Sequence, residues 1–128
     1  MRILFLDYDD YRVAKFKDRT GLDVVWAKTC SEFIAYLQSN RFDYIFLDHD
    51  LDLSGLDAGT GTDAAKYLAD NPGHVSGDTQ VVIHSWNSYG VANMVNVLKH
   101  IDDMRLHVIH GAWHRAFMLN NVQLAFRL

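Results

Sequence analysis

Short apolar runs recur along the chain, each too brief for a helix and rich in residues that favour strands. The third run reads FDYIFLD and the fourth reads TQVVIHS, with few polar residues in either. Near-continuous apolar runs are typical of strands that are covered on both faces of a sheet. The pattern therefore predicts five strands, at residues 2–7, 23–29, 42–48, 79–85 and 105–111.

Segments between these runs carry the 3.6-residue periodicity of amphipathic helices. The clearest spans 89–102, where four apolar residues are spaced i, i+3, i+4 and i+7 from Val91. A second helix is predicted at 31–40, with Ser31 as its N-cap, and a third at 62–71, where an Asn-Pro-Gly turn ends it.

Alternation of strands and helices with apolar strands predicts an α/β fold built on a parallel sheet. Five strands in this length indicate a doubly wound, flavodoxin-like sheet with strand order 2-1-3-4-5. Residues 1–128 are expected to form a single domain with an atypical C-terminal tail. In that tail, 112–128, apolar spacing permits a helix at first and the alternation of VQLAFRL then indicates a strand.

Composition narrows the classes of function. The 128 residues are 49% hydrophobic and 22% charged, with a net charge of −4. Lys and Arg are scattered, which argues against a duplex DNA partner, and no apolar segment is long enough to span a membrane. The single cysteine, Cys30, fits a reducing compartment, and the short apolar start followed by acids is unlike a signal peptide, so a cytoplasmic location is expected.

Polar residues follow three of the predicted strands, in LDYDD, LDHDL and IHSWN. The carboxyl ends of parallel strands share one edge, which is where doubly wound folds place their ligand site. Asp7 and Asp48 each end an apolar run directly, which favours a site for a hard cation such as Mg²⁺. For Asp9, Asp10 and Asp52, solvated turn positions are the better interpretation.

His49 and His84 form the second candidate constellation. If Asp48 and Ser85 lie level on neighbouring strands, the two imidazoles share one face and can straddle a phosphate as general base and general acid. The alternative is two half-buried histidines bonded to backbone carbonyls. Ser85 and Asn87 supply polar groups beside them, although Asn87 or Ser88 can also serve as a helix N-cap.

The motifs LFLDxDxxR, FDYIFLDHDL, GTGTDAAKYL and HSWNSYGVANM together resemble the cyclic-phosphate processing receiver-like domains, over residues 2–99. These domains are relatives of response-regulator receivers. The resemblance implies a site that contains Asp7, Asp48, His49, Asp50, Gly61, Asp63, His84, Ser85, Asn87 and Gly90. Arg12 matches the same pattern and is expected to offer charge to a phosphate.

Two departures from the receiver pattern matter. Tyr8 stands where a second acid is usual, so binding of Mg²⁺ or Mn²⁺ at Asp7 and Asp48 is expected to be weak or absent. The stretch VIHGAW lacks the lysine that receivers carry after the fifth strand, so the usual phosphoryl-aspartate switch at Asp48 is not expected.

The resemblance implies a hydrolase, a phosphodiesterase that opens a cyclic phosphate on a nucleotide or an RNA 2′,3′-cyclic phosphate end. His49 and His84 are expected to share the acid and base roles, with Asp48 or Asp50 orienting an imidazole. Substrate phosphate would be held by Ser85, Asn87 and the loop that contains Gly61, with Asp63, Gly90 and Arg12 nearby. The alternative is a non-catalytic module that sequesters a cyclic nucleotide, or a degenerate signalling receiver, and only the histidine pair favours an enzyme.

Overall fold

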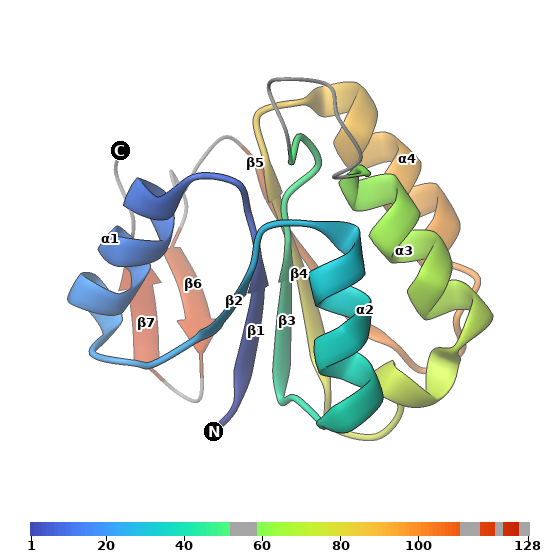
Figure 1. The fold of residues 1–128 in the computed structure, drawn as a ribbon, viewed down its shortest axis with the longest axis horizontal. Helices are drawn as coiled ribbons and strands as arrows, with labels where there is room; N and C mark the ends of the chain where they lie inside the picture. Colours follow the sequence, from blue (N-terminus) through green and yellow to red (C-terminus); the bar gives the residue numbers. More distant parts are fainter. Residues whose placement is uncertain (52–58, 111–115, 120–121, 126–128) are drawn as a thin grey trace.

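The computed structural model describes residues 1–51, 59–110, 116–119 and 122–125 (Figure 1). The strands are β1 (Ile3–Leu6), β2 (Val25–Ala27), β3 (Tyr44–Leu47), β4 (Gln80–Ser85), β5 (Arg105–His110), β6 (Ala116–Leu119) and β7 (Val122–Ala125). The helices are α1 (Asp10–Thr20), α2 (Cys30–Ser39), α3 (Gly61–Asp70) and α4 (Ser88–Leu98), with a short 3-10 helix, η1, at Pro72–Val75.

The first five strands form one parallel sheet in the order β2-β1-β3-β4-β5. The predicted doubly wound fold and its strand order are therefore confirmed. Ile3 to Leu6 of β1 lie level with Tyr44 to Leu47 of β3, so both strands end at the same height. The residues that follow them, Asp7 and Asp48, meet at the carboxyl edge of the sheet.

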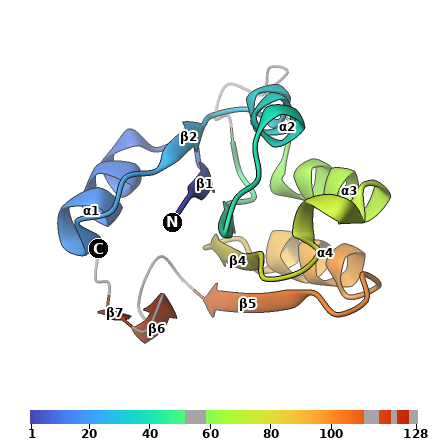
Figure 2. The same ribbon diagram turned by 90° about the horizontal axis from the view of Figure 1, so that it is seen from below.

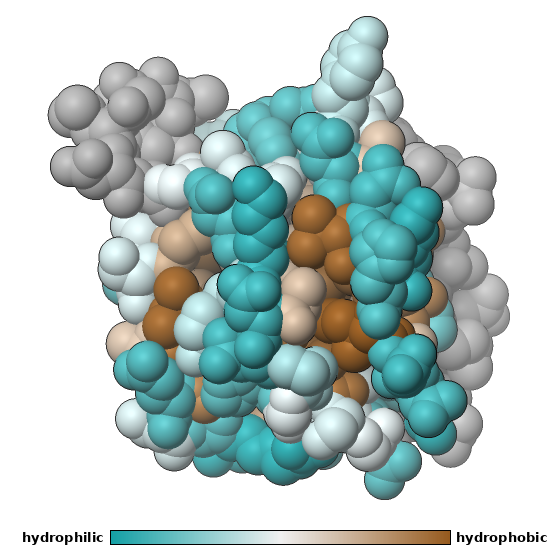
Figure 3. All heavy atoms as spheres, turned by 90° about the vertical axis from the view of Figure 1, so that its right-hand side faces the viewer, coloured by the Kyte–Doolittle hydropathy of each residue, from teal (hydrophilic) through white to brown (hydrophobic). Residues whose placement is uncertain are grey.

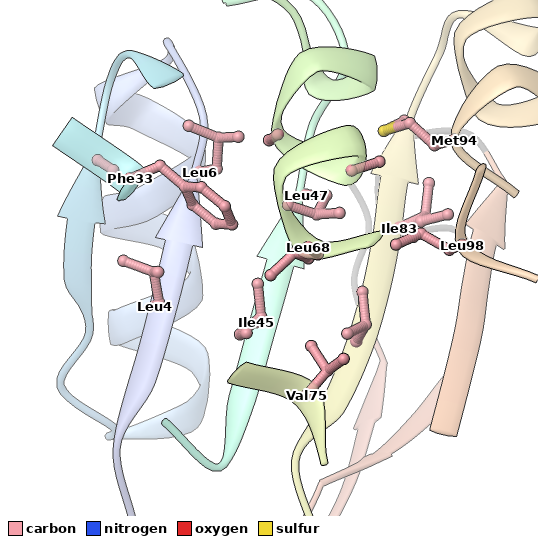
Figure 4. Packing of buried hydrophobic residues seen from close by; sticks show 14 of the residues in the cluster. Leu4, Leu6, Phe33, Ile45, Leu47, Leu68, Val75, Ile83, Met94 and Leu98 are labelled. Carbon is pink, nitrogen blue, oxygen red and sulfur yellow. The ribbon is translucent and has the colours of Figure 1, made fainter. Parts of the chain in front are cut away.

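Alternation of side chains along the strands separates two apolar clusters. One contains Leu4, Leu6, Leu47 and Ile83 and packs under α2, α3 and α4 (Figure 4). Seen from outside, this helical layer shows hydrophilic ridges with hydrophobic residues between them (Figure 3). This cluster supplies the rigid support from which α3 and α4 present their N-termini at the carboxyl edge.

The second cluster lies on the other face of the sheet, under α1, which Figure 2 shows on the opposite side from α3 and α4. The aromatic rings of Phe5, Phe16 and Phe46 contact one another at centroid distances of 5.1–5.2 Å. Ile3 and Val13 complete its buried centre. The two clusters make the faces chemically distinct, which decides where each polar residue at the edge can point.

Helix α1 was not predicted from the sequence. It buries only Arg12, Val13 and Phe16, so its apolar stripe is too narrow to be visible within a charged stretch. Its ends carry recognisable signals, since the Asp9 side chain accepts from Tyr11 N–H as N-cap and Gly21 closes the helix at φ 67°. Asp9 is therefore a capping residue rather than a solvated turn.

The other helices begin close to the predicted positions. Thr29, rather than Ser31, caps α2, because its hydroxyl accepts from Glu32 N–H. Thr60 and Asp63 form a reciprocal capping box at α3, and Asn87 caps α4. No helix in the described part of the chain is long and apolar enough to cross a membrane. The cytoplasmic location and the lack of a duplex DNA partner stay predictions.

The C-terminal tail differs from the expected helix followed by a strand. β6 and β7 pair antiparallel, with Ala116 level with Ala125, so a strand replaces the predicted helix at 116–119, while the predicted strand is present at 122–125. A strand at 116–119 forms its backbone hydrogen bonds with β7, which local apolar spacing cannot reveal. Trp113 and Leu128, part of the same expectation, lie outside the described residues.

Candidate functional site

The strand register decides which polar residues share a face. Leu47 lies level with Ile83, so Asp48 continues level with His84 and not with Ser85. The register assumed from the sequence is therefore wrong by one residue, and one residue turns a side chain to the other face. His84 lies with Asp48 on the α1 side, whereas His49 points to the side of α3 and α4.

On the α1 side Asp7, Arg12 and Asp48 form a buried ion cluster, with His84 beneath it. Arg12 donates from Nε to Asp7 Oδ2 at 3.0 Å and from Nη2 to Asp7 Oδ1 at 2.7 Å. The same Nη2 donates to Asp48 Oδ2 at 3.1 Å. One guanidinium therefore bridges two carboxylates that are 0% and 3% exposed.

Burial dominates the ionisation of these carboxylates. It raises the pKa of Asp7, although the hydrogen bonds and charge of Arg12 oppose the rise. It raises the pKa of Asp48 to about 8, and the neighbouring charge of Asp7 adds to the effect. Two carboxylates that share one cation in a desolvated position are more stable with one proton between them, so we assign that proton to Asp48 at neutral pH.

His84 is part of the core beneath this cluster. It is 2% exposed and its ring lies 4.9 Å from that of Phe5 and 6.0 Å from that of Phe46, measured between centroids. Its Nδ1 lies 3.8 Å from Asp7 Oδ2, beyond hydrogen-bond distance. Burial and the charge of Arg12 hold the pKa of His84 well below its ordinary value of 6.5, so the imidazole is neutral at physiological pH.

The residues expected to hold a divalent cation do not fit one. Arg12 already bonds both Asp7 and Asp48, and its positive charge opposes a second cation between them. Tyr8 supplies no carboxylate; its ring instead lies 5.1 Å from the Arg12 guanidinium. Among the described residues, no three His, Cys, Asp or Glu side chains converge on a possible metal position.

On the side of α3 and α4 lies a second group, the His49 site, which contains His49, Asp50, Thr62 and Asn87. His49 Nδ1 lies 2.9 Å from Asp50 Oδ1, and His49 Nε2 lies 3.1 Å from the Thr62 hydroxyl. Asn87 Nδ2 donates to Asp50 Oδ1 at 3.2 Å. The His49 side chain is 14% exposed and that of Asp50 is 54% exposed, so this site is open to solvent.

The hydrogen bonds define the tautomer of His49. Hydrogen bonds from His49 and Asn87 lower the pKa of Asp50, which is therefore a carboxylate that only accepts. The 2.9 Å contact with this carboxylate favours Nδ1–H as a donor to Asp50 over Nδ1 as the acceptor of the longer, 3.4 Å contact from Asn87 Nδ2. In that tautomer Nε2 accepts from the Thr62 O–H. A chain of hydrogen bonds therefore runs from the Asp50 carboxylate through the His49 imidazole to the Thr62 hydroxyl.

Two glycines allow His49 to sit between the N-termini of α3 and α4. A Cβ on Gly90 would lie 2.2 Å from His49 Cγ, and a Cβ on Gly61 would lie 2.2 Å from the Asp48 carbonyl oxygen. Gly61 also donates its N–H to the His49 carbonyl at 2.8 Å. The structure thus gives the two glycines named from the sequence a steric role in holding the imidazole.

The remaining predicted residues make structural hydrogen bonds. Ser85 is 6% exposed and its hydroxyl accepts from Asn87 N–H at 3.1 Å. The Asp63 carboxylate accepts from Thr60 N–H in the capping box. Asn87 uses its oxygen to cap α4 through Gly90 N–H and its amide nitrogen to hold Asp50.

Thr62 was missed in the sequence, although it lies within the quoted GTGTD motif. A threonine that begins a helix is normally interpreted as a cap. The signal that could have identified it is that Thr60, two residues earlier, already provides the cap, which leaves the Thr62 hydroxyl available for another contact.

Comparison with known proteins supports this picture of the fold. The sequence profile described as "Cyclic-phosphate processing Receiver domain" matches residues 2–100. No curated protein matches the chain. The three solved structures described next are 16–21% identical to this chain, so they inform the fold alone.

One is a two-component response regulator from Clostridium difficile, at 21% identity and a TM-score of 0.63, with 86% of this chain and 82% of that chain covered. A chemotaxis protein of Vibrio cholerae has 16% identity and a TM-score of 0.62, with 85% and 84% covered. A Thermotoga maritima response regulator in complex with Mg²⁺ and BeF has 16% identity and a TM-score of 0.61, with 84% and 85% covered.

Replacing His84 should test its role as a core residue. We expect His84→Ala to lower the free energy of unfolding by about 2–3 kcal/mol, because it leaves a cavity against Phe5 and Phe46. Urea unfolding measures the loss, and His100→Ala, at an exposed histidine, is the matched control with no expected change. Unchanged stability in His84→Ala would contradict the assignment of His84 to the core.

Replacing Asp48 with its neutral isostere should change how stability depends on pH. Because the pKa of Asp48 is raised in the folded state, its stabilising contribution is fully present when the pH is below the ordinary pKa of 3.8. That contribution is lost as the pH rises through about 8. Asp48→Asn cannot ionise, so its unfolding free energy relative to the natural protein should increase by on the order of 2–4 kcal/mol between pH 5 and pH 9.

Asp50→Asn is the control for this series. The pKa of Asp50 is lowered, so the stability that this group contributes is lost only when the pH falls below the ordinary pKa of 3.8. Its contribution is therefore constant from pH 5 to pH 9. Parallel pH profiles for Asp48→Asn and the natural protein would show that Asp48 is already ionised at pH 5.

Proposed function

Because the chain belongs to the family of cyclic-phosphate processing receiver domains, we propose that it is a phosphoesterase that opens a cyclic phosphate on a nucleotide or an RNA end. The observation that carries the proposal is the hydrogen-bonded pair of Asp50 and His49, at 2.9 Å, in a solvent-accessible position at the carboxyl edge of the sheet. His49 is the general base and later the general acid, and Asp50 and Asn87 are positioning residues.

A single imidazole is sufficient for the reaction. His49 Nε2 takes the proton from the attacking O–H group while the oxygen of that group bonds to phosphorus. Asp50 stabilises the imidazolium that forms. The imidazolium then gives that proton to the ribose oxygen as the P–O bond of the ring breaks. His84, placed in the core and neutral, is not required as the acid, which replaces the shared roles expected from the sequence.

Exposed aromatic side chains next to the His49 site support a nucleotide as substrate. Trp86, which directly precedes Asn87, is 62% exposed, and Tyr89, the second residue of α4, is 85% exposed. Exposed rings at this position can stack on a base, an interaction available to any base and worth about 1–3 kcal/mol.

The reaction as proposed needs no divalent cation. Arg12, which was expected to bind substrate phosphate, instead bonds Asp7 and Asp48 from a position that is 9% exposed. The carboxylates that would have bound Mg²⁺ or Mn²⁺ are therefore used for an internal ion pair, and the chemistry lies with His49 on the other face.

Replacing His49 should abolish turnover without unfolding the protein. Against a panel of 2′,3′- and 3′,5′-cyclic nucleotides, we expect His49→Asn to lower turnover about 100- to 10,000-fold, since it removes the group that transfers the proton. Chromatographic detection of the opened phosphomonoester measures the rate, and melting temperature checks the fold. His100→Ala, an exposed histidine away from the site, should retain full turnover.

The same panel separates the proposal from a binding module. Saturable binding of a cyclic nucleotide by the natural protein with no product, even at high enzyme concentration, would establish sequestration rather than catalysis. Normal turnover by His49→Asn would show that another group is the base.

Chelation should leave the reaction intact. We expect the same turnover with and without EDTA, and no rise in melting temperature on addition of Mg²⁺, because Arg12 occupies the position between the carboxylates. Arg12→Met removes that cation, so its melting temperature should rise with Mg²⁺. Turnover lost in EDTA and restored by Mg²⁺ or Mn²⁺ would overturn the metal-independent mechanism.

A further inference from the structure

We propose that Thr62 is the nucleophile of this site, and that the reaction passes through a covalent nucleotidyl-threonine intermediate, a phosphodiester between Thr62 Oγ1 and the opened nucleotide. The inference deepens the proposed function and rests on it for the identity of the substrate. It begins from the contact between His49 Nε2 and Thr62 Oγ1 at 3.1 Å, which the cyclic-phosphate assignment does not explain.

The direction of the hydrogen bonds makes the hydroxyl the donor. The Asp50 carboxylate accepts a hydrogen bond from His49 Nδ1–H at 2.9 Å, so in this tautomer Nε2 directs a lone pair toward Thr62 Oγ1. A threonine hydroxyl is a weak nucleophile until an adjacent base takes its proton. The order of carboxylate, imidazole and hydroxyl is the one that activates serine in hydrolases with a catalytic triad.

The local fold holds this hydroxyl in place. Thr62 is the second residue of α3, and Gly61 N–H bonds the His49 carbonyl at 2.8 Å, so helix and histidine are tied through their backbones. The His49 ring is confined by Gly90, on which no Cβ would fit. Thr62 itself is partly exposed, as a nucleophile must be.

The chemical steps balance with the groups present. Thr62 Oγ1 bonds to phosphorus, the P–O bond to one ribose oxygen breaks, and the Thr62 proton passes through His49 to that oxygen. Water then bonds to phosphorus, the bond from phosphorus to Oγ1 breaks, and the water proton passes through His49 to Thr62. The products are the opened phosphomonoester and the free hydroxyl.

A simpler role for Thr62 is to orient the imidazole, with water attacking directly. The two roles differ in whether a phosphorus atom is ever bonded to Oγ1. A fluorophosphonate probe tests this point without knowledge of the substrate: attack by Oγ1 forms the O–P bond, fluoride leaves, and His49 takes the proton.

The experiment is to treat the full chain with a fluorophosphonate, then measure intact mass and map the modified peptide. We expect one adduct, on Thr62, whose rate of formation falls at least about 100-fold in Thr62→Val and in His49→Asn. Thr62→Ser should keep the rate within about tenfold, because it retains the hydroxyl. Ser31→Ala, at the exposed second residue of α2, is the matched control and should label normally.

Cyclic-nucleotide turnover separates this inference from the proposed function. Labelling at Thr62 without turnover of any cyclic nucleotide would keep the nucleophile and discard the substrate class. Turnover retained in a folded Thr62→Val, or a probe adduct absent from Thr62 in the natural protein, would overturn the nucleophile and leave His49 as the base for water.

Discussion

The guanidinium of Arg12 bonds two buried carboxyl groups, Asp7 and Asp48, and the carboxyl edge of the sheet depends on it. Without Arg12, Asp7 and Asp48 would face each other in a desolvated position, which is among the most costly arrangements in a protein. With it, the ends of β1 and β3 are tied to α1 and one proton suffices to balance the cluster. This ion pair converts what would be a cation site into a structural element of the fold.

The edge of the sheet is divided because consecutive residues of a strand point to opposite faces. Asp48 and His49 are adjacent in the chain, yet the first joins Arg12 under α1 and the second lies against Gly90 of α4. Desolvation suppresses ionisation on the first face, and solvent access permits proton transfer on the second. The proposed chemistry therefore belongs to the face of His49, while the ion cluster fixes the backbone from which His49 projects.

Apolar runs in the sequence were enough to predict the five strands, because strands buried on both faces leave a continuous signal. Their order followed from the doubly wound architecture that five such strands indicate. The register between β3 and β4 was not predictable, because a shift of one residue preserves every apolar run. That shift moves His84 from the face of His49 to the face of Asp7. Arg12 was expected to offer charge to a phosphate because it matches the pattern of the family, and its contact with Asp7 could not be seen while α1 was not recognised. Thr62 escaped notice because hydrogen bonds between side chains distant in sequence leave no periodicity.

The same ion pair bears on how this chain differs from response regulators with the same fold. Asp48 is buried and bonds Arg12, and burial raises its pKa to about 8, so we expect its carboxyl group to be a poor nucleophile for a phosphoryl group at neutral pH. The adjacent residue, His49, points the other way and is joined to a carboxylate and a hydroxyl instead. Asp48 and His49 are consecutive residues after β3, and they point to opposite faces of the sheet. The chain therefore keeps the receiver fold, while its proposed chemistry uses the imidazole of His49 on the face away from Arg12.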